Sequence, residues 1–209
     1  MRRGVSPRVR LTAFRKRHRI PRVFRARAAD CARPGDKNKM NAQELLKRYA
    51  AGERDFANAD LRGIKFVEEK LRGIVLRGAN LEKADFGWAN LEGADLEGAN
   101  LKGANLHSAH LNKANLMNAD LSDAKLKTCG LRQANLENAN LRGAVLVGAK
   151  LQGANLKNAN LVKTHLDGAD FTDADTTGAD MTFTETTNAV GLVIPKDKAS
   201  LKRFDRSAS

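Results

Sequence analysis

Aromatic residues, proline and cysteine are scarce in this chain of 209 residues, and it has no long apolar segment. Aromatics make up 5% of the residues, too few for the usual packing of a globular core, although apolar residues as a class reach 42%. The two cysteines cannot build a disulfide framework. No run approaches the roughly 18 apolar residues that span a bilayer, so we expect no membrane insertion.

Basic charge is concentrated at one end of the chain. Residues 1–39 hold fourteen Lys and Arg against Asp30 and Asp36, whereas residues 40–209 are nearly neutral. Three interpretations of the basic segment stay open: a misassigned start with Met40 as the first residue, a disordered basic arm, and an organellar transit peptide. We therefore expect a cytoplasmic protein, or an organelle-targeted one if the segment is a transit peptide. Nucleic acid is expected as a partner only if this tail is present.

A five-residue repeat runs through the middle of the chain. Every fifth residue from Phe56 to Phe171 is Leu or Phe, 24 in succession. A second position lies two places before each of these, and it recurs 28 times from Arg54 to Ala189. Of these 28 residues 21 are Ala, and the residue between this position and the Leu is mostly Asn or Asp. A period of five fits neither an amphipathic helix nor a flat strand.

The residue types of the repeat predict a square coil. Eleven of the seventeen glycines fall two places after the repeat's Leu position, where a type II turn needs a positive φ. A chain that turns every five residues and buries Leu and Ala closes after twenty residues, and successive coils would stack at about 4.8 Å. Charges twenty residues apart support this register. The predicted contacts between coils are Arg62–Glu82–Lys102, Arg72–Glu92, Arg77–Glu97 and Glu137–Lys157.

The A(D/N)LXX units resemble the pentapeptide-repeat family over about residues 54–190, and the segment Met40–Phe56 resembles the start of many cyanobacterial members. The resemblance implies an all-β fold, a right-handed quadrilateral β-helix with Leu, Phe and Ala inside. It fixes no biochemical role, because one fold hosts many functions.

The chain is accordingly divided into four parts. They are a basic, disordered tail (1–39), an N-terminal capping helix (40–53), the β-helix (54–190), and a C-terminal cap and tail (191–209). The helix is expected over 41–51, with Asn41 at its cap and Leu45, Leu46 and Tyr49 on the side that covers the first coil. At the other end we expect an apolar strand over 189–194 and a small helix with Leu201 and Phe204, which either cap the stack or form a homodimer contact.

Catalytic chemistry is not expected from this sequence. A core filled with Leu and Ala leaves no cleft in which titratable groups converge. His107 and His110 straddle a corner, and Cys129 occupies an Ala position, which indicates a small buried thiol. With no phosphate loop or zinc spacing either, we expect no enzyme, no metal and no cofactor.

The Asn/Asp position points to a binding surface. On the two faces that begin at Asp55 and Asp60, thirteen of fourteen residues at this position are Asp or Asn, whereas nine of thirteen depart on the other two faces. Stacked Asn and Asp suit the fold alone, so departures confined to one half of the rod indicate either a function or ordinary drift on a solvated face. The candidate partner-binding face consists of Trp88, His107, Lys125, Lys127, Val145, Val147 and His165.

The leading functional hypothesis is a non-catalytic structural module, a rigid rod that docks a partner protein through a side face. The resemblance implies an alternative, mimicry of DNA by a regulator or protector of a DNA-binding enzyme such as gyrase. Residues 54–190 hold 16 basic and 18 acidic side chains, which argues against uniform mimicry. Six acids gather near the C-terminal end: Asp167, Asp170, Asp173, Asp175, Asp180 and Glu185. A third hypothesis is polyanion binding through the basic N-terminal tail.

Overall fold

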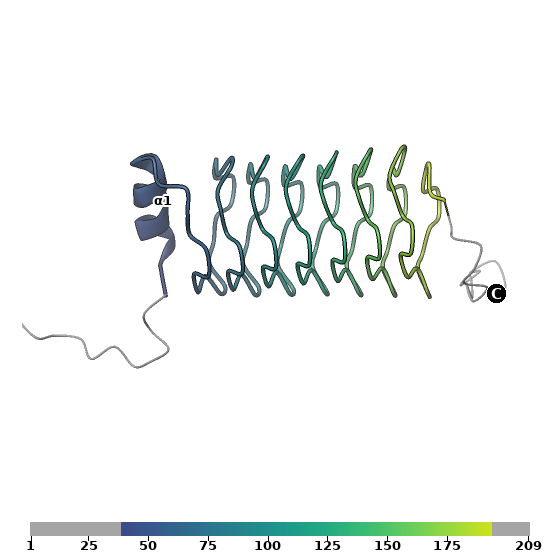
Figure 1. Cartoon of the computed structure of the whole chain (residues 1–209), viewed down its shortest axis with the longest axis horizontal. Helices are drawn as coiled ribbons and strands as arrows, with labels where there is room; N and C mark the ends of the chain where they lie inside the picture. Colours follow the sequence, from purple (N-terminus) through teal and green to yellow (C-terminus); the bar gives the residue numbers. More distant parts are fainter. Residues whose placement is uncertain (1–38, 194–209) are drawn as a thin grey trace, which may run out of the picture.

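Residues 39–193 are described by the computed structural model, in which short parallel coils stack into a rod (Figure 1). Parallel bridges join each residue at the Asn/Asp position to the residue twenty places further along. The N–H of Leu116 donates to the carbonyl of Asn135 (2.7 Å), and the N–H of Asn135 donates to the carbonyl of Ala114 (2.9 Å). The predicted twenty-residue coil is therefore confirmed.

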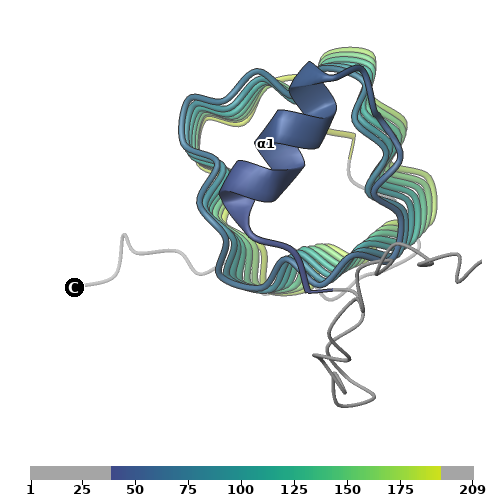
Figure 2. The ribbon, with the colours of Figure 1, turned by 90° about the vertical axis from the view of Figure 1, so that its left-hand side faces the viewer.

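Each coil has four sides, and we name the faces of the rod by the residues at the Asn/Asp position. Face A begins at Asp55, face B at Asp60, face C at Lys65 and face D at Lys70, and each continues every twenty residues along the rod. Viewed along the rod, the coils superimpose almost completely (Figure 2). A side chain on one face is therefore stacked on its equivalents in the coils above and below.

The corners have the geometry that the sequence predicts. The residue two places after each Leu has a positive φ at all 27 corners from Asn58 to Asn188. At Gly93, φ is 66°, and the N–H of the next residue, Ala94, donates to the carbonyl of Leu91 (2.9 Å). Sixteen of these corner residues are not glycine, so hydrogen bonding between coils imposes this conformation on ordinary residues as well.

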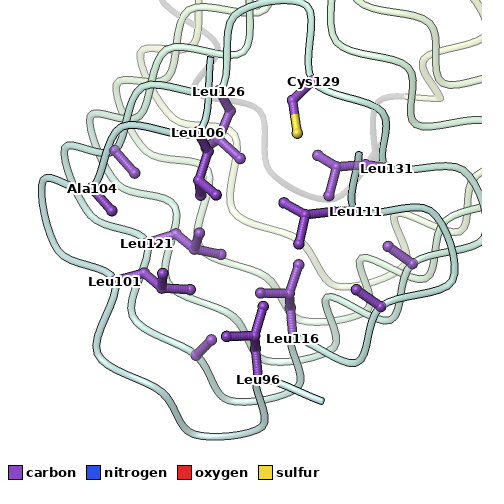
Figure 3. Packing of buried hydrophobic residues seen from close by; sticks show 14 of the residues in the cluster. Leu96, Leu101, Ala104, Leu106, Leu111, Leu116, Leu121, Leu126, Cys129 and Leu131 are labelled. Carbon is purple, nitrogen blue, oxygen red and sulfur yellow. The ribbon is translucent and has the colours of Figure 1, made fainter. Parts of the chain in front are cut away.

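The core contains the residues that the repeat places inside. The inward Leu and Phe and nearly all the inward Ala side chains are buried, and they fill the coil in layers (Figure 3). Cys129 is fully buried in an Ala position, as expected, and its thiol lies 3.2 Å from the carbonyl oxygen of Ala109. Thr164 and Thr184 are also buried inside, and each hydroxyl donates to the carbonyl of Leu161.

Helix α1 (Ala42–Ala50) lies across the first coil, as Figure 2 shows. Asn41 caps its N-terminus, and the Asn41 side chain accepts a hydrogen bond from the N–H of Glu44 (2.8 Å). Leu45 is fully buried, and the Tyr49 hydroxyl donates to the carbonyl of Arg72 (2.8 Å). In the part of the chain that the structure describes, no helix has the length and apolar character needed to cross a membrane.

The charge contacts between coils differ from those predicted, although the register is right. Arg72 and Glu92 form the predicted ion pair (3.2 Å). Arg77 instead pairs with Asp95, eighteen residues away (2.5 Å), and Lys157 pairs with Asp175 in the same way (3.2 Å). Asp95 and Asp175 lie close to the preceding coil, so they compete with the stacked Glu for the basic side chain.

The other two predicted charge contacts are also wrong as ion pairs. Arg62 bonds to Asp60 of its own coil (2.7 Å) rather than to Glu82, and Glu82 lies beside Lys83 (3.6 Å) rather than Lys102. These side chains are long and exposed, so a nearer partner on the same coil replaces the stacked one.

The last coil ends at Val190, which bridges to Asp170. Residues 191–193 do not form the expected strand, because the chain leaves the stack there, and the Thr176 hydroxyl donates to the Val193 carbonyl (2.8 Å). The expected small helix with Leu201 and Phe204 lies outside the described residues, as do residues 1–38 of the basic tail.

Candidate functional site

The Asn and Asp side chains of the repeat stabilise the fold itself. Most of them accept a hydrogen bond from the N–H two residues later, as Asn135 does from Glu137 (3.2 Å). Many also donate to the side chain twenty residues earlier, as Asn155 does to Asn135 (3.1 Å). Such ladders follow faces A and B, whereas on faces C and D the single ladder contact between described Asn or Asp side chains joins Asn105 to Asp85 (2.7 Å). The residues that replace Asn or Asp on faces C and D therefore take no part in these ladders.

Five of the seven candidate residues line one open hollow at the corner between faces C and D. We call it the Trp88 hollow, and it encloses about 380 Å³. Its lining residues are Trp88, Asn105, His107, Lys125, Lys127 and Val145. Val147 lies one coil above Lys127, and His165 lies two coils above Lys125. Both are on the same side of the rod, but they do not line the hollow.

The stacking of this surface agrees with the sequence prediction. Val145 bridges to Lys125 below it and to His165 above it, and Thr128 at the Lys127 corner donates its N–H to the carbonyl of Val147 (2.8 Å). Val145 and Val147 are half-buried rather than fully exposed, because neighbouring coils cover part of each side chain. The exposed apolar surface of the hollow therefore comes mainly from Trp88, which is 53% exposed.

Trp88 occupies an unfavourable backbone position. Its φ is 55°, in the left-handed region where the repeat often has Gly or Asn. This conformation is strained for a bulky residue and reduces the stability of the fold. The indole meets the ring of His107 edge-on, with ring centroids 5.0 Å apart. A large aromatic side chain is thus held at the mouth of the hollow at some cost to the fold.

The two lysines of the hollow form no ion pair with another described residue. Within residues 39–193, neither Lys125 nor Lys127 lies within 4.0 Å of a carboxylate. His165 differs, because its Nδ1 lies 2.7 Å from Glu185. The two lysines are therefore available to a ligand, whereas His165 is already paired.

Acidic groups elsewhere on the rod are stabilised in their charged form. The hydrogen bond from Arg62 lowers the pKa of Asp60, and the Thr172 hydroxyl lowers the pKa of Asp170. Burial has the opposite effect on Cys129 and raises the pKa of its thiol. That thiol is therefore protonated and out of reach of solvent.

The two neighbouring histidines lie on different parts of the surface. His107 lines the Trp88 hollow, whereas His110 is exposed on face D, beyond the corner. Among residues 39–193, no three His, Cys, Asp or Glu side chains are grouped closely enough to hold a metal ion.

A second hollow at the corner between faces D and A was not predicted from the sequence. We call it the Arg132 hollow, and it encloses about 390 Å³. Its lining residues are Asn112, Lys113, Arg132, Gln133, Gln152, Gly153 and Asp173. Most of these residues follow the Leu, where the repeat imposes no residue type, so the pattern contained no signal for them. The nearby departure at Gly130 was the one available sign.

Comparison with known proteins gives a family match. The model of a family described as "Pentapeptide repeats" matches in eight copies over residues 55–93, 84–123, 124–161 and 149–184, which is more than half of the chain. No curated protein matches the chain.

Three solved structures illustrate the likeness. A pentapeptide repeat protein of the Arabidopsis thaliana thylakoid lumen is 32% identical, with 48% of this chain and 67% of that chain covered and a TM-score of 0.41. HetL from Nostoc sp. strain PCC 7120, described as involved in heterocyst differentiation regulation, is 29% identical, with 73% and 98% covered and a TM-score of 0.27. QnrB1, a plasmid-mediated fluoroquinolone resistance protein, is 21% identical, with 63% and 76% covered and a TM-score of 0.46. Since all three TM-scores are below 0.5, the assignment rests on the matched repeats. The chain belongs to the pentapeptide repeat family, whose fold is the right-handed quadrilateral β-helix.

Proposed function

We propose that this protein is a non-catalytic docking module, a rigid rod that binds a partner protein at the Trp88 hollow. The observation that carries the proposal is the division of the rod. Asn and Asp ladders support faces A and B, while the departures from Asn and Asp gather on faces C and D, where the hollow lies.

The chemistry of the hollow suits a protein surface. Trp88 and Val145 supply apolar area, and Lys125 and Lys127 supply cations at its rim. Aromatic anchors surrounded by charge are typical of protein interfaces. Burying a half-exposed Val at such an interface contributes up to about 1.5 kcal/mol.

Affinity capture with the tagged full-length protein tests the proposal. Val145→Asp combined with Val147→Asp should abolish recovery of a partner without unfolding the rod. The control is Val162→Asp, because Val162, like Val147, is half-buried and follows a Leu, but lies at the corner between faces B and C. If the control loses the partner and the double variant keeps it, the assignment of the face is wrong.

Mimicry of DNA at the acidic end is the second candidate function. It is favoured by the absence of Lys and Arg from residues 164–190, which hold all six acids of that end. Several of these acids are engaged within the rod, since Asp175 pairs with Lys157 and Glu185 with His165. Fewer free carboxylates remain to imitate a phosphate backbone, so we favour the docking module.

A further inference from the structure

The two hollows flank the same face of the rod. The Trp88 hollow lies at the corner before face D, and the Arg132 hollow lies at the corner after it. A single coil joins them, and it presents Lys125, Lys127, Gly130 and Arg132 in that order. A ligand that follows this coil across face D would reach both hollows.

Face D is bare at the middle of this path. Gly130 stacks between His110 and Lys150 and leaves no side chain between them. In place of the missing Asn or Asp, the Asn112 side chain of the coil below accepts the N–H of Arg132 (3.0 Å). The corner is therefore formed without a side chain at residue 130, and the Asn112 side chain lies beside the glycine, with its Oδ1 3.1 Å from the point where a Cβ would stand.

The same side of the rod is strongly basic. We define the basic side as the stacked segments 104–113, 124–133 and 144–153, which hold five Lys and Arg, two His and no Asp or Glu. The intervening segments hold five acids and two basic residues over 94–103, 114–123 and 134–143. Charge is thus separated between the two halves of the same coils.

The cations of the basic side are not neutralised within the rod. Among residues 39–193, Lys113, Lys125, Lys127 and Arg132 form no ion pair. Three acids of neighbouring coils lie beside the basic side. Asp173 lines the Arg132 hollow, Asp170 lies above Lys150, and Asp85 bonds to Asn105 beneath the Trp88 hollow.

We propose that the basic side binds an extended acidic segment of a partner polypeptide, which crosses face D over Gly130. An apolar side chain of the segment occupies the Trp88 hollow, and a carboxylate lies at Arg132 in the other hollow. Arginine suits this role because its guanidinium binds a carboxylate through two parallel hydrogen bonds. The inference deepens the proposed docking function, on which it rests, by naming the chemistry of the partner.

The surface favours a polypeptide over single-stranded nucleic acid. Nucleic acid binding would require several aromatic platforms for stacked bases. On the described part of the basic side, Trp88 at its edge is the one exposed aromatic residue, and His107 already meets its ring edge-on. Val145 offers an aliphatic contact, which suits an amino-acid side chain better than a base.

The direct test is fluorescence anisotropy with the full-length protein and a labelled peptide of alternating Glu and Leu. Gly130→Asp should weaken binding by about tenfold, because it places a negative charge where the acidic segment crosses face D. Gly130→Asn is the matched control and should weaken binding by no more than about threefold, because it adds the same bulk as Asp without the charge. Both variants should fold, because Gly130 does not have a left-handed φ. A new Cβ would lie 3.1 Å from Asn112 Oδ1 and displace it slightly, but the introduced Asp or Asn can accept the Arg132 N–H in its place, as the repeat's own residue does elsewhere.

A second pair of variants tests the Arg132 hollow separately. Arg132→Glu should weaken peptide binding by about tenfold, whereas Arg142→Glu should change it by less than about twofold. Both arginines are exposed and follow a Leu, but Arg142 lies outside the basic side. Any binding by the basic tail is common to all the variants and cancels in the comparison.

Three results would overturn the inference. The first is that the peptide does not bind the wild type, and the second is that the two variants of either matched pair lose the same binding affinity. The third is that Gly130→Asp weakens binding of an oligothymidine probe but not of the peptide. If Val145→Asp with Val147→Asp releases a captured partner while Arg132→Glu leaves the peptide bound, the docking function stands and the acidic segment is wrong. If the Val variants also keep the partner, the docking function itself fails.

Discussion

At the scale of single residues, two positions of the repeat have different tasks. The inward Leu supplies the apolar core, while the Asn or Asp before it accepts backbone hydrogen bonds at the corner. A change at the first position alters burial, and a change at the second alters hydrogen bonding. The two positions therefore differ in what a substitution costs.

Leu116→Lys should be strongly destabilising. Leu116 is fully buried in the middle of the rod, so an unpaired charge there would cost about 3–5 kcal/mol. The neighbouring Met117 points outward and stacks between Glu97 and Glu137, so Met117→Lys should change stability by no more than about 0.5 kcal/mol. Thermal unfolding measures both, and equal melting temperatures for the two variants would contradict the inward register.

Acid should destabilise the C-terminal coils. Asp170 and Asp175 each accept a hydrogen bond from the threonine two residues later, and this holds both pKa values below the ordinary value. A lowered pKa in the folded state contributes stability above the unfolded pKa of about 3.9, and this stability is lost as the pH falls through the folded pKa.

We therefore expect a melting temperature that is constant above about pH 5 and falls below about pH 4. Asp170→Asn with Asp175→Asn should show a smaller fall, because Asn keeps the acceptor oxygen and has no carboxylate to protonate. An unchanged acid response in the double variant would show that these carboxylates do not contribute.

At the scale of elements, α1 acts as a lid on the first coil. Leu45→Ala should destabilise the protein by about 2–5 kcal/mol, because Leu45 is fully buried against that coil. Stability in a stacked repeat depends mainly on neighbouring units, so the loss should begin at the N-terminal end. Hydrogen exchange should quicken in the first coil and not in the last, and uniform quickening would contradict a local lid.

The sequence was most informative where the backbone decides the structure. The five-residue period predicted the coil, the corners and the buried Leu and Ala, because each follows from the chain path alone. It failed for side chains with freedom to choose a partner, so Arg77 pairs with Asp95 rather than Glu97. In the same way, the sequence placed Trp88 at the candidate surface but did not show that the Arg132 N–H donates to the Asn112 side chain of the coil below, in place of a side chain at Gly130.

At the scale of the whole molecule, the rod has a structural half and a half with different chemistry. Faces A and B hold the Asn and Asp ladders, and the basic side holds the two hollows. The predicted basic arm lies outside the described residues. Deletion of residues 1–38 should leave the circular dichroism and the melting temperature unchanged, because the repeat and α1 lie beyond it. A large fall in melting temperature would show that the arm contributes to the fold.

The central claim is that the departures on faces C and D serve binding rather than folding. The most direct measurement compares the melting temperature and the partner recovery of Lys125→Asn combined with Val145→Asn. Both changes restore the repeat's own residue, so the melting temperature should be equal to or above that of the wild type, because new corner hydrogen bonds contribute about 1 kcal/mol each. Partner recovery should be lost. A lower melting temperature with the partner retained would contradict the account, because Lys125 and Val145 would then serve the fold.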